Sequence, residues 1–323
     1  VTFTSAIKLP EAMDEFRVAG ALAKSPINIV KAKTVDLMVP AEAEIVIEGY
    51  ISTEFLEPEA PFGESHGHVN LQEYNAFMDV TCITRKKNAI LTSIISQVTP
   101  SESSVIKRVA YEPMFTEHLR DHLGIKGVIK VSMHEPLTNI RKLIVIICER
   151  GMPSTEVWRA MYGAATLHRA AGKYIIAVND DIDPNNADAI FWAMAYRANP
   201  ALDVEILKHR DSGHGPRSPR NGGEDASVLF DATLKEDFPP ISLPKKEFML
   251  NAKEIWEELG LPELTPQVPW HGYSLGEWEE EFDVMAKRAV ESDYFKTGEI
   301  IAQRRRSDLT MNTEVRTLND EDD

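Results

Sequence analysis

The stretch GKYIIAVNDDIDPNNADAIFWAMAYR, residues 172–197, carries the clearest signal of the chain's architecture. It begins with the apolar run Tyr174–Val178, passes through acids and a proline, and ends in a segment with helical spacing. A similar apolar run, Lys142–Cys148, lies upstream, and a helical pattern over 154–171 separates the two. Short, nearly continuous apolar runs are typical of strands buried on both faces. The alternation therefore predicts a mostly parallel sheet flanked by helices.

The same alternation continues on both sides of this stretch. We expect helices near 101–122 and 185–198, and strands at Gly127–Val131 and Val204–Leu207. The polar residues 209–226, rich in Gly, Pro and Ser, are typical of a surface loop.

The first hundred residues have another pattern. Their short runs of alternating polarity predict strands. We expect strands at Val35–Val39, Glu44–Ile51, Ala76–Thr84 and Ala89–Val98, after a short amphipathic helix at 14–25. Residues 85–88 between the last two runs predict a hairpin, and residues 54–70 read as a loop. This part of the chain is thus expected to form an antiparallel β unit, as a barrel or a sandwich.

The domain boundaries follow these changes of pattern. Residues 1–100 are interpreted as a β-rich domain, and residues 101–235 as an α/β/α domain. Residues 236–323 are interpreted as a C-terminal extension with helices at 246–259 and 275–291 and an acidic tail. A chain of 323 residues is long enough for about two domains.

Composition excludes several classes of protein. The net charge is −16, from 35 basic and 51 acidic residues, which disfavours a nucleic-acid binder. No apolar run reaches the roughly 18 residues that a membrane span needs. Cys82 and Cys148 lie in apolar stretches and are expected to be reduced, and no signal peptide opens the chain, so a cytoplasmic location is expected. No P-loop, GxGxxG or GxSxG motif is present. Because Val1 begins a strand-like run without an initiator Met, we expect a longer chain with an N-terminal region upstream.

The loop EPEAPFGESHGH, residues 57–68, gathers three acids and two histidines. If Glu59 and Glu64 converge in a closed site, both cannot comfortably ionise, and one could hold a proton for transfer. A solvated acidic loop explains the same composition. A third interpretation is a metal site, since Glu64, His66 and His68 share one face of an extended segment.

The acids that follow Val178 also allow two interpretations. Asp180, Asp181 and Asp183 could cap the next helix, or they could bind magnesium. Capping is the simpler of the two.

Four segments resemble, in order, motifs of the UbiD-type prenylated-FMN-dependent decarboxylases. They are SAIKLPEAMDEFRVAGAL (5–22), AEIVIEGYI with EAPFGESHGH (43–51 and 59–68), GKYIIAVNDDIDPNNADAIFWAMAYRANP (172–200) and FDATLK (230–235). The second resembles the family's strand and acidic EGPFGE/D loop. The segments cover most of residues 4–235 with compatible spacing, so the resemblance is specific.

The resemblance implies a fold and an activity. The fold would be mixed α/β: part of a split β-barrel flavin-binding domain, an α/β/α oligomerisation domain and C-terminal helices. The activity would be reversible, non-oxidative decarboxylation of an aromatic, heteroaromatic or α,β-unsaturated carboxylic acid. The implied cofactors are prenylated FMN, Mn²⁺ (or Mg²⁺) and K⁺, and the implied assembly is a homo-oligomer, a dimer or a hexamer.

The resemblance also assigns residues in the acidic loop. Glu59 and Glu64 take the places of the two acids in the family's Arg–Glu–Glu/Asp network, with Glu64 as the proton donor. His66 and His68 would line the substrate pocket.

Further residues would hold the cofactor and its ions. Glu15 matches the acid that binds the divalent metal beside the cofactor phosphate. Thr4, Ser5 and Ile7 match the potassium-binding segment, and Lys173 matches a lysine near the flavin.

The sequence departs from the family pattern in three places. The network's arginine and the other metal ligands would lie upstream of Val1. Ala60 stands where the family has glycine, and residues 65–68 differ from the aromatic-rich turn of other members. Because half of the cofactor site is missing from the numbered chain, a catalytically silent assembly subunit is the alternative function.

Aromatic residues gather late in the chain, where they predict a surface that binds a partner. They are Trp256, Trp270, Trp278, Phe282, Tyr294 and Phe295.

Overall fold

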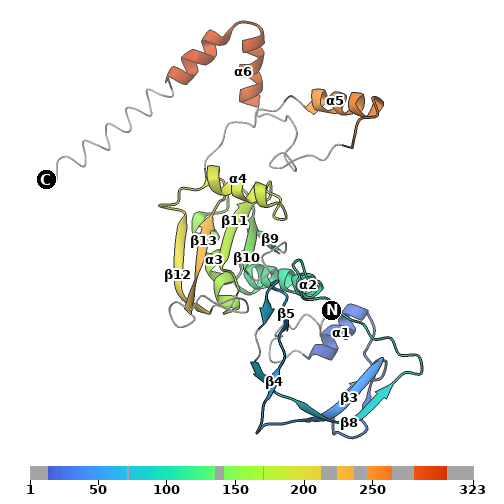
Figure 1. The fold of residues 1–323 in the computed structure, drawn as a ribbon. Helices are drawn as coiled ribbons and strands as arrows, with labels where there is room; N and C mark the ends of the chain where they lie inside the picture. The colour runs from blue at the N-terminus through green and yellow to red at the C-terminus, as the bar shows by residue number, and fades with distance from the viewer. Residues whose placement is uncertain are drawn as a thin grey trace, which may run out of the picture. The chain divides into compact units, whose positions relative to one another are not determined.

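The computed structural model of the protein describes residues 14–70, 73–134, 142–169, 171–211, 224–235, 244, 246–263 and 280–303. The chain divides into two compact units, residues 1–235 and 236–323 (Figure 1). Within the described ranges, no helix has the length and apolar character needed to cross a membrane.

A five-stranded sheet organises the second half of the first unit. Its strands are β9 (Val128–Met133), β10 (Leu143–Cys148), β11 (Tyr174–Asn179), β12 (Val204–Asp211) and β13 (Glu224–Asp231), in the order β12-β13-β11-β10-β9. The three inner strands are parallel, whereas β9 and β12 run antiparallel to their neighbours. The predicted mostly parallel sheet is therefore parallel at its centre and antiparallel at both edges.

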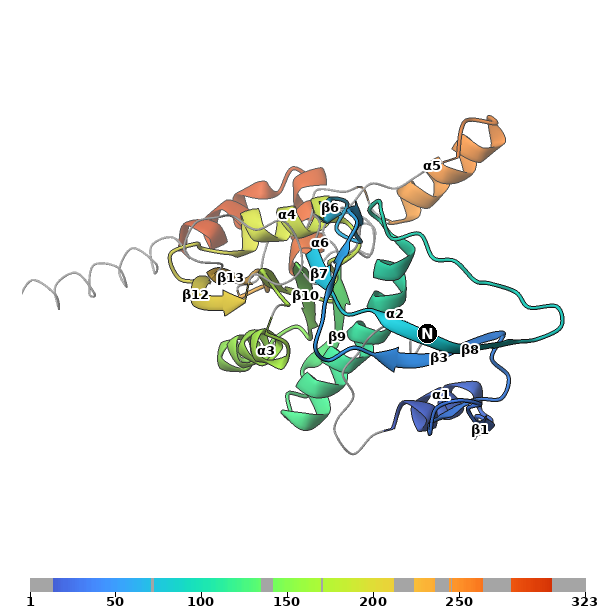
Figure 2. The same cartoon turned by 60° about the horizontal axis from the view of Figure 1, so that its bottom comes forward.

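Helices cover both sides of this sheet. They are α2 (Glu102–Glu117), α3 (Ser154–Leu167) and α4 (Ala187–Arg197). A short π-helix, His118–His122, continues α2. Helices α2 and α3 share one buried cluster with the sheet, and Figure 2 shows α4 on the opposite side. Ser101 and Asn186 cap α2 and α4 by accepting hydrogen bonds from backbone N–H groups of the first turns.

The core lies between α2, α3 and the sheet. Phe115, Ile146 and Met161 are among its fully buried side chains. Each large apolar side chain buried in this way contributes about 1.5–3 kcal/mol relative to exposure. Cys148 is a buried free thiol, and this burial raises its pKa to about 12, whereas Cys82 is half-buried. The buried cluster therefore holds α2, α3 and the sheet together.

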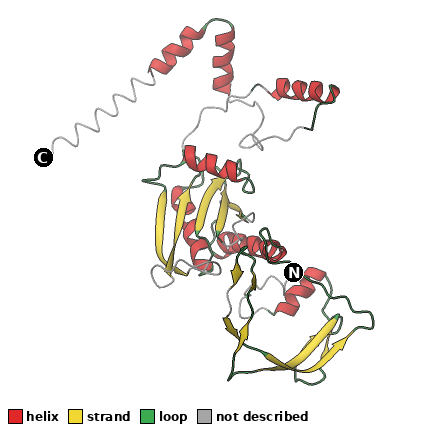
Figure 3. Ribbon diagram, in the orientation of Figure 1, coloured by secondary structure: helices red, strands yellow, loops and turns green. Residues whose placement is uncertain are grey.

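The first part of the unit consists of short antiparallel pairs. The helix α1 (Glu15–Ala23) precedes the pairs β1 (Ile29–Lys31) with β2 (Met38–Pro40), β3 (Ile45–Ile51) with β8 (Met78–Arg85), β4 (Glu57–Glu59) with β7 (Glu73–Asn75), and β5 (Phe62–Gly63) with β6 (Val69–Asn70). Figure 3 shows these strands as separate ribbons. The described strands here are antiparallel, as predicted, and do not close into a barrel.

The predicted hairpin at residues 85–88 is wrong. Strand β8 pairs with β3, and residues 89–98 form no strand. Their backbone bonds to side chains instead: the Ile90 N–H donates to Glu44 Oε2 at 3.1 Å, and the Ile95 N–H donates to Glu102 Oε2 at 2.7 Å. These bonds replace the ladder that a hairpin would need.

Part of the predicted strand Val35–Val39 is a turn. The buried carboxylate of Glu48 accepts hydrogen bonds from the N–H groups of Lys33 at 2.9 Å and Thr34 at 2.6 Å. These bonds hold the pKa of Glu48 below its ordinary value. They also fix the turn against the β3–β8 ribbon, so the strand begins only at Met38.

Two segments predicted as loops contain strands. Residues 54–70 include β4, β5 and β6, and the ends of the segment 209–226 belong to β12 and β13. These segments are polar, and their strands form because tertiary contacts bring the partner strands together, which local sequence does not predict.

One face of the β3–β8 ribbon is apolar and exposed. Ile47 and Ile83 lie directly opposite each other in the register and are 54% and 61% exposed. Ile51 and Val80, further along the ribbon, are also exposed. We call these four residues the β3–β8 apolar face. Contiguous exposed apolar surface of this kind marks a site of interaction.

The second unit contains helices α5 (Lys246–Glu258) and α6 (Glu280–Val290), followed by a helix over 294–303. The first two agree with the predicted helices at 246–259 and 275–291. Trp256 donates its indole N–H to the Pro262 carbonyl at 2.7 Å, which closes the end of α5.

Candidate active site

Glu59 is the last residue of the short strand β4. It lies directly opposite Glu73 on β7, and its carboxylate accepts a hydrogen bond from the Asn75 side-chain amide. Like charges facing each other across a strand pair are unfavourable. The Asn75 amide therefore gives the Glu59 carboxylate a neutral donor that holds it in one orientation.

Glu64 begins the turn between β5 and β6. Its N–H donates to the His68 carbonyl at 3.0 Å, and the Gly67 N–H donates to the Glu64 carbonyl at 2.9 Å. The residue is half-buried. Its backbone is thus fixed at both ends of the turn, so a proton donor at this position would be presented by a closed hairpin.

Two glycines make this hairpin possible. A Cβ on Gly63 would lie 2.7 Å from side-chain carbons of Gln97, which is closer than packed atoms can approach. Gly67 has a φ of +83°, a value that favours glycine. Ala60, which replaces the family's glycine, is not among the positive-φ residues of the described chain, so alanine fits there without strain.

His66 and His68 lie close together in the turn. Their ring centroids are 5.5 Å apart, and the His68 N–H donates to His66 Nδ1 at 3.3 Å. In the described part of the chain, no three His, Cys, Asp or Glu side chains are grouped as metal ligands. The structure therefore gives no support to a metal site of Glu64, His66 and His68.

Glu15 lies in the first turn of α1 and is exposed. Asp14 caps that helix by accepting from the N–H groups of Phe16 at 2.7 Å and Arg17 at 3.2 Å. Because Asp14 performs the capping, the Glu15 carboxylate is left for other interactions. The predicted potassium ligands Thr4, Ser5 and Ile7 lie outside the described residues.

Lys173 belongs to a different part of the fold. It directly precedes β11 in the five-stranded sheet, and its Nζ lies 2.9 Å from Asp225 Oδ2 and 3.1 Å from Oδ1. Its charge is thus partly neutralised by Asp225. A contact with a cofactor would have to share the ammonium group with that carboxylate.

Two of the acids after β11, Asp181 and Asp183, form contacts within the fold. The Asp181 side chain is only 8% exposed, and its Oδ2 lies 2.6 Å from Arg197 and 2.8 Å from Arg150. The helix is capped by Asn186, and Asp183 accepts from the Asn185 N–H at 2.9 Å. The predicted capping by these acids is therefore wrong: Asn186 caps α4, and Asp181 forms an ion pair that capping did not predict.

Two contacts of the site were absent from the sequence-based expectations. Asn75 reaches Glu59 only through the β4–β7 register, and Gln97 reaches Gly63 across residues without regular structure. The sequence contains no local signal for either contact.

The acidic segment 57–68, the closed β5–β6 hairpin and the strand–helix block that follows can be compared with known proteins. Residues 1–98 match the Rift-related domain of the 3-octaprenyl-4-hydroxybenzoate carboxy-lyases (UbiD), and residues 104–232 match the C-terminal domain of the same family. The chain belongs to the UbiD family.

Individual relatives agree with this assignment. An uncharacterized protein of Archaeoglobus fulgidus is 26% identical over 270 residues, which are 80% of this chain and 54% of that protein. The UbiD-class enzyme HmfF from Pelotomaculum thermopropionicum, solved with FMN, is 27% identical with a TM-score of 0.67, over 78% of this chain and 56% of HmfF. An evolved dimeric HmfF with prenylated FMN is 26% identical with a TM-score of 0.63, over 75% and 52%. The chain thus spans about half the length of the relatives it matches.

Proposed function

We propose that this chain supplies the catalytic acids of a reversible, non-oxidative carboxy-lyase that acts on aromatic, heteroaromatic or α,β-unsaturated carboxylic acids. The observation that carries the proposal is the EAPFGESHGH segment. It combines a family motif with a closed hairpin that starts at Glu64 and a strand end that holds Glu59. The flavin cofactors of the HmfF structures support prenylated FMN as the cofactor.

The described residues fit the cofactor and its ions in part. The exposed Glu15 carboxylate is a hard oxygen donor, which suits Mn²⁺ or Mg²⁺. Since the described chain groups no three metal ligands, the remaining ligands have to come from elsewhere. Thr4, Ser5 and Ile7, which lie outside the described residues, would bind K⁺.

The chemistry divides between cofactor and protein. Prenylated FMN supplies, when bound, the electron sink that no amino-acid side chain offers to the electrons left behind by carbon dioxide. Glu64 then delivers a proton to the carbon that lost the carboxylate. Glu59, whose carboxylate accepts a hydrogen bond from Asn75, would be the second acid of the network. His66 and His68 line the pocket on the turn side, and the prolines at 58 and 61 limit the motion of the loop.

The complete site requires further residues. The β3–β8 apolar face is exposed in this chain, and the chain spans only about half the length of the matched relatives. We infer that an N-terminal flavin-binding region covers this face and supplies the arginine of the acid network. The same two observations support the alternative function, a catalytically silent assembly subunit.

Replacement of Glu64 tests the proposal. In the complete, cofactor-loaded protein, Glu64→Gln keeps the shape of the side chain and removes its proton. Turnover, measured as carbon dioxide release and as exchange of solvent deuterium into product, should fall by about 10²–10⁴-fold. Glu57→Gln removes an exposed acid two residues before Glu59 and serves as the matched control, with turnover near wild type. Wild-type release and exchange by Glu64→Gln would reject Glu64 as the donor.

A further inference from the structure

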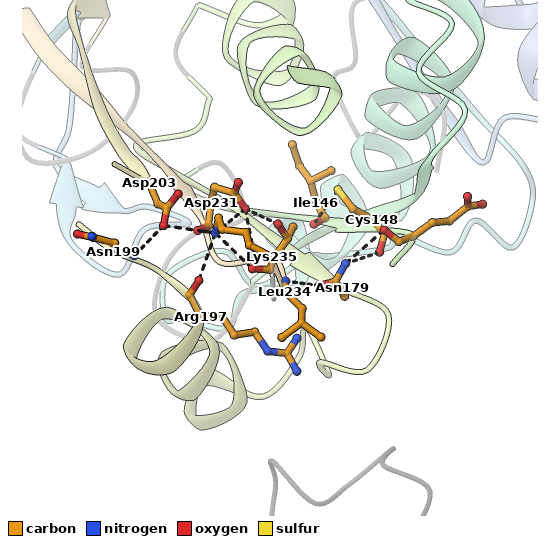
Figure 4. A network of polar contacts seen from close by, with 11 residues as sticks. Ile146, Cys148, Asn179, Arg197, Asn199, Asp203, Asp231, Leu234 and Lys235 are labelled. Carbon is orange, nitrogen blue, oxygen red and sulfur yellow. Dashed lines mark hydrogen bonds and ion pairs between the residues drawn. The ribbon is translucent and has the colours of Figure 1, made fainter. Parts of the chain in front are cut away.

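The ammonium group of Lys235 lies at the centre of a polar network at the end of β13 (Figure 4). Its Nζ donates to the backbone carbonyls of Asp231 at 2.8 Å, Arg197 at 3.2 Å and Thr233 at 3.3 Å. It also lies 3.4 Å from Asp203 Oδ2 and 3.4 Å from Asp231 Oδ1. Five oxygens therefore surround one positive charge.

The donors and acceptors of this arrangement match. A lysine ammonium has three N–H donors, and each has a carbonyl oxygen to receive it. The carboxylates of Asp203 and Asp231 add two further oxygens around the ammonium group. Such a shell of carbonyl and carboxylate oxygens is the kind that proteins offer to hard cations.

The protein builds this shell from three separate segments. The Arg197 carbonyl ends α4, where the helix dipole favours a positive charge. Asp203 lies just before β12, and its backbone carbonyl accepts from the Asp231 N–H at 2.9 Å. The Thr233 N–H in turn donates to Asp231 Oδ1 at 2.9 Å. The oxygens thus hold their positions through bonds that do not involve Lys235.

The shell carries more negative charge than Lys235 neutralises. Asp203 and Asp231 bring two carboxylates against one ammonium group, and the Asp231 side chain is only 1% exposed. Its second oxygen, Oδ2, is buried and has no hydrogen-bond partner. A buried carboxylate oxygen in this state favours a cation close by.

We propose that these oxygens form a monovalent-cation site that Lys235 fills from within the chain. The class of ligand that fits in its place is an ion of the size of ammonium or potassium. Divalent ions fit poorly, because Mg²⁺ and Ca²⁺ require oxygens at about 2.0–2.6 Å and several carboxylates. The Lys235 side chain is 32% exposed, so an ion can enter from solvent once the side chain is removed.

The site ties together the ends of α4 and β13 and the start of β12. A tethered ammonium group holds these segments at any salt concentration, because it cannot dissociate into solvent. The tether therefore makes the carboxyl edge of the sheet independent of the ions around it.

Truncation of the lysine tests this proposal in the full chain. We would measure the thermal midpoint of Lys235→Ala by tryptophan fluorescence in choline chloride, ammonium chloride and potassium chloride at equal ionic strength. Lys126→Ala is the matched control, since it removes an exposed lysine that pairs with Asp121 at 3.3 Å. The wild type measures the effect of these salts on every other part of the chain.

We expect Lys235→Ala to unfold several degrees below wild type in choline chloride. Ammonium or potassium should restore part of the loss with a saturable concentration dependence, and should leave wild type and Lys126→Ala unchanged relative to choline. The double variant Asp203→Asn/Lys235→Ala should lose this recovery. Equal midpoints of Lys235→Ala in the three salts would overturn the proposal.

A second measurement needs no variant. Reductive methylation of the wild-type chain, followed by mass spectrometry, compares the rates at Lys235 and Lys126. An ammonium group with all three donors engaged should react at least several-fold more slowly. Equal rates at the two lysines would overturn the proposal even if Lys235→Ala fails to fold.

Discussion

Asp181 carries the most informative ion pair of the α/β part. Burial by itself would raise the pKa of its carboxyl, but the hydrogen bonds and charge of Arg197, with the charge of Arg150, hold the pKa below its ordinary value. The Arg197 guanidinium also lies over the ring of Trp192, 5.2 Å from the ring centroid. This cluster joins the end of β11 to α4.

Replacing Asp181 should therefore destabilise the fold. Asp181→Asn leaves the buried Arg197 guanidinium without its counter-charge, which costs about 3–5 kcal/mol of unfolding free energy. Urea unfolding measures the loss. Asp180→Asn, at the exposed neighbouring position, is the control and should remain within about 0.5 kcal/mol of wild type.

The pH dependence of this loss has a definite sign. Because the folded pKa of Asp181 lies below its unfolded value, the native state binds fewer protons, and the stabilisation is full above the unfolded pKa. It disappears as pH falls through the folded value. The difference between wild type and Asp181→Asn should therefore shrink below about pH 4. A difference that grows with acid would contradict the assignment.

The contacts of single residues were the hardest to predict. The acids Glu59 and Glu64 could be proposed from a motif, because a motif is a local pattern. Asn75 and Lys235 could not, since Asn75 meets Glu59 through strand register and Lys235 meets Arg197 and Asp203 only where the α4–β12 connection lies beside the end of β13.

The helix α1 carries Glu15, whose side chain could stabilise the helix or bind a metal ion. Asp14 already caps the helix, so Glu15→Gln should change the unfolding free energy by less than about 1 kcal/mol. In the complete protein we expect the same variant to lose bound manganese, measured by elemental analysis beside flavin content. Glu42→Gln, another exposed acid of the same part, should lose neither. Unchanged manganese in Glu15→Gln would remove it from the proposed metal site.

The strands β9, β10, β11 and β12 and the helices of the α/β part followed from the sequence, because their apolar runs or helical spacing are long enough to detect. The short pairs β4–β7 and β5–β6 did not, since strands of two or three residues have too little pattern to detect. The same holds for β13, whose first residues continue a polar loop. The hairpin at 85–88 was predicted from a good turn sequence. The strand before this turn, β8, pairs with β3 instead.

At the scale of the whole molecule, we predict self-association. Tyr294 and Phe295 are exposed in the helix over 294–303, as are Phe191 and Tyr196 on α4. Aromatic side chains are enriched in protein–protein interfaces, so we expect each of these two pairs to be buried against a second copy. Light scattering at micromolar concentration should therefore give a mass of at least twice the 36.2 kDa of one chain. A strictly monomeric chain would contradict this prediction.

We propose that this chain holds the catalytic acids and that residues outside it complete the cofactor site. The most direct test is the flavin absorbance of the 323-residue chain, purified from cells that make prenylated FMN. HmfF prepared in the same way is the positive control, since its structures contain FMN and prenylated FMN. We predict that HmfF keeps its flavin and that this chain keeps none, because the charge of the cofactor phosphate stays unneutralised. Stoichiometric flavin on the 323-residue chain alone would show that this chain by itself forms a complete cofactor site, and would contradict the proposal.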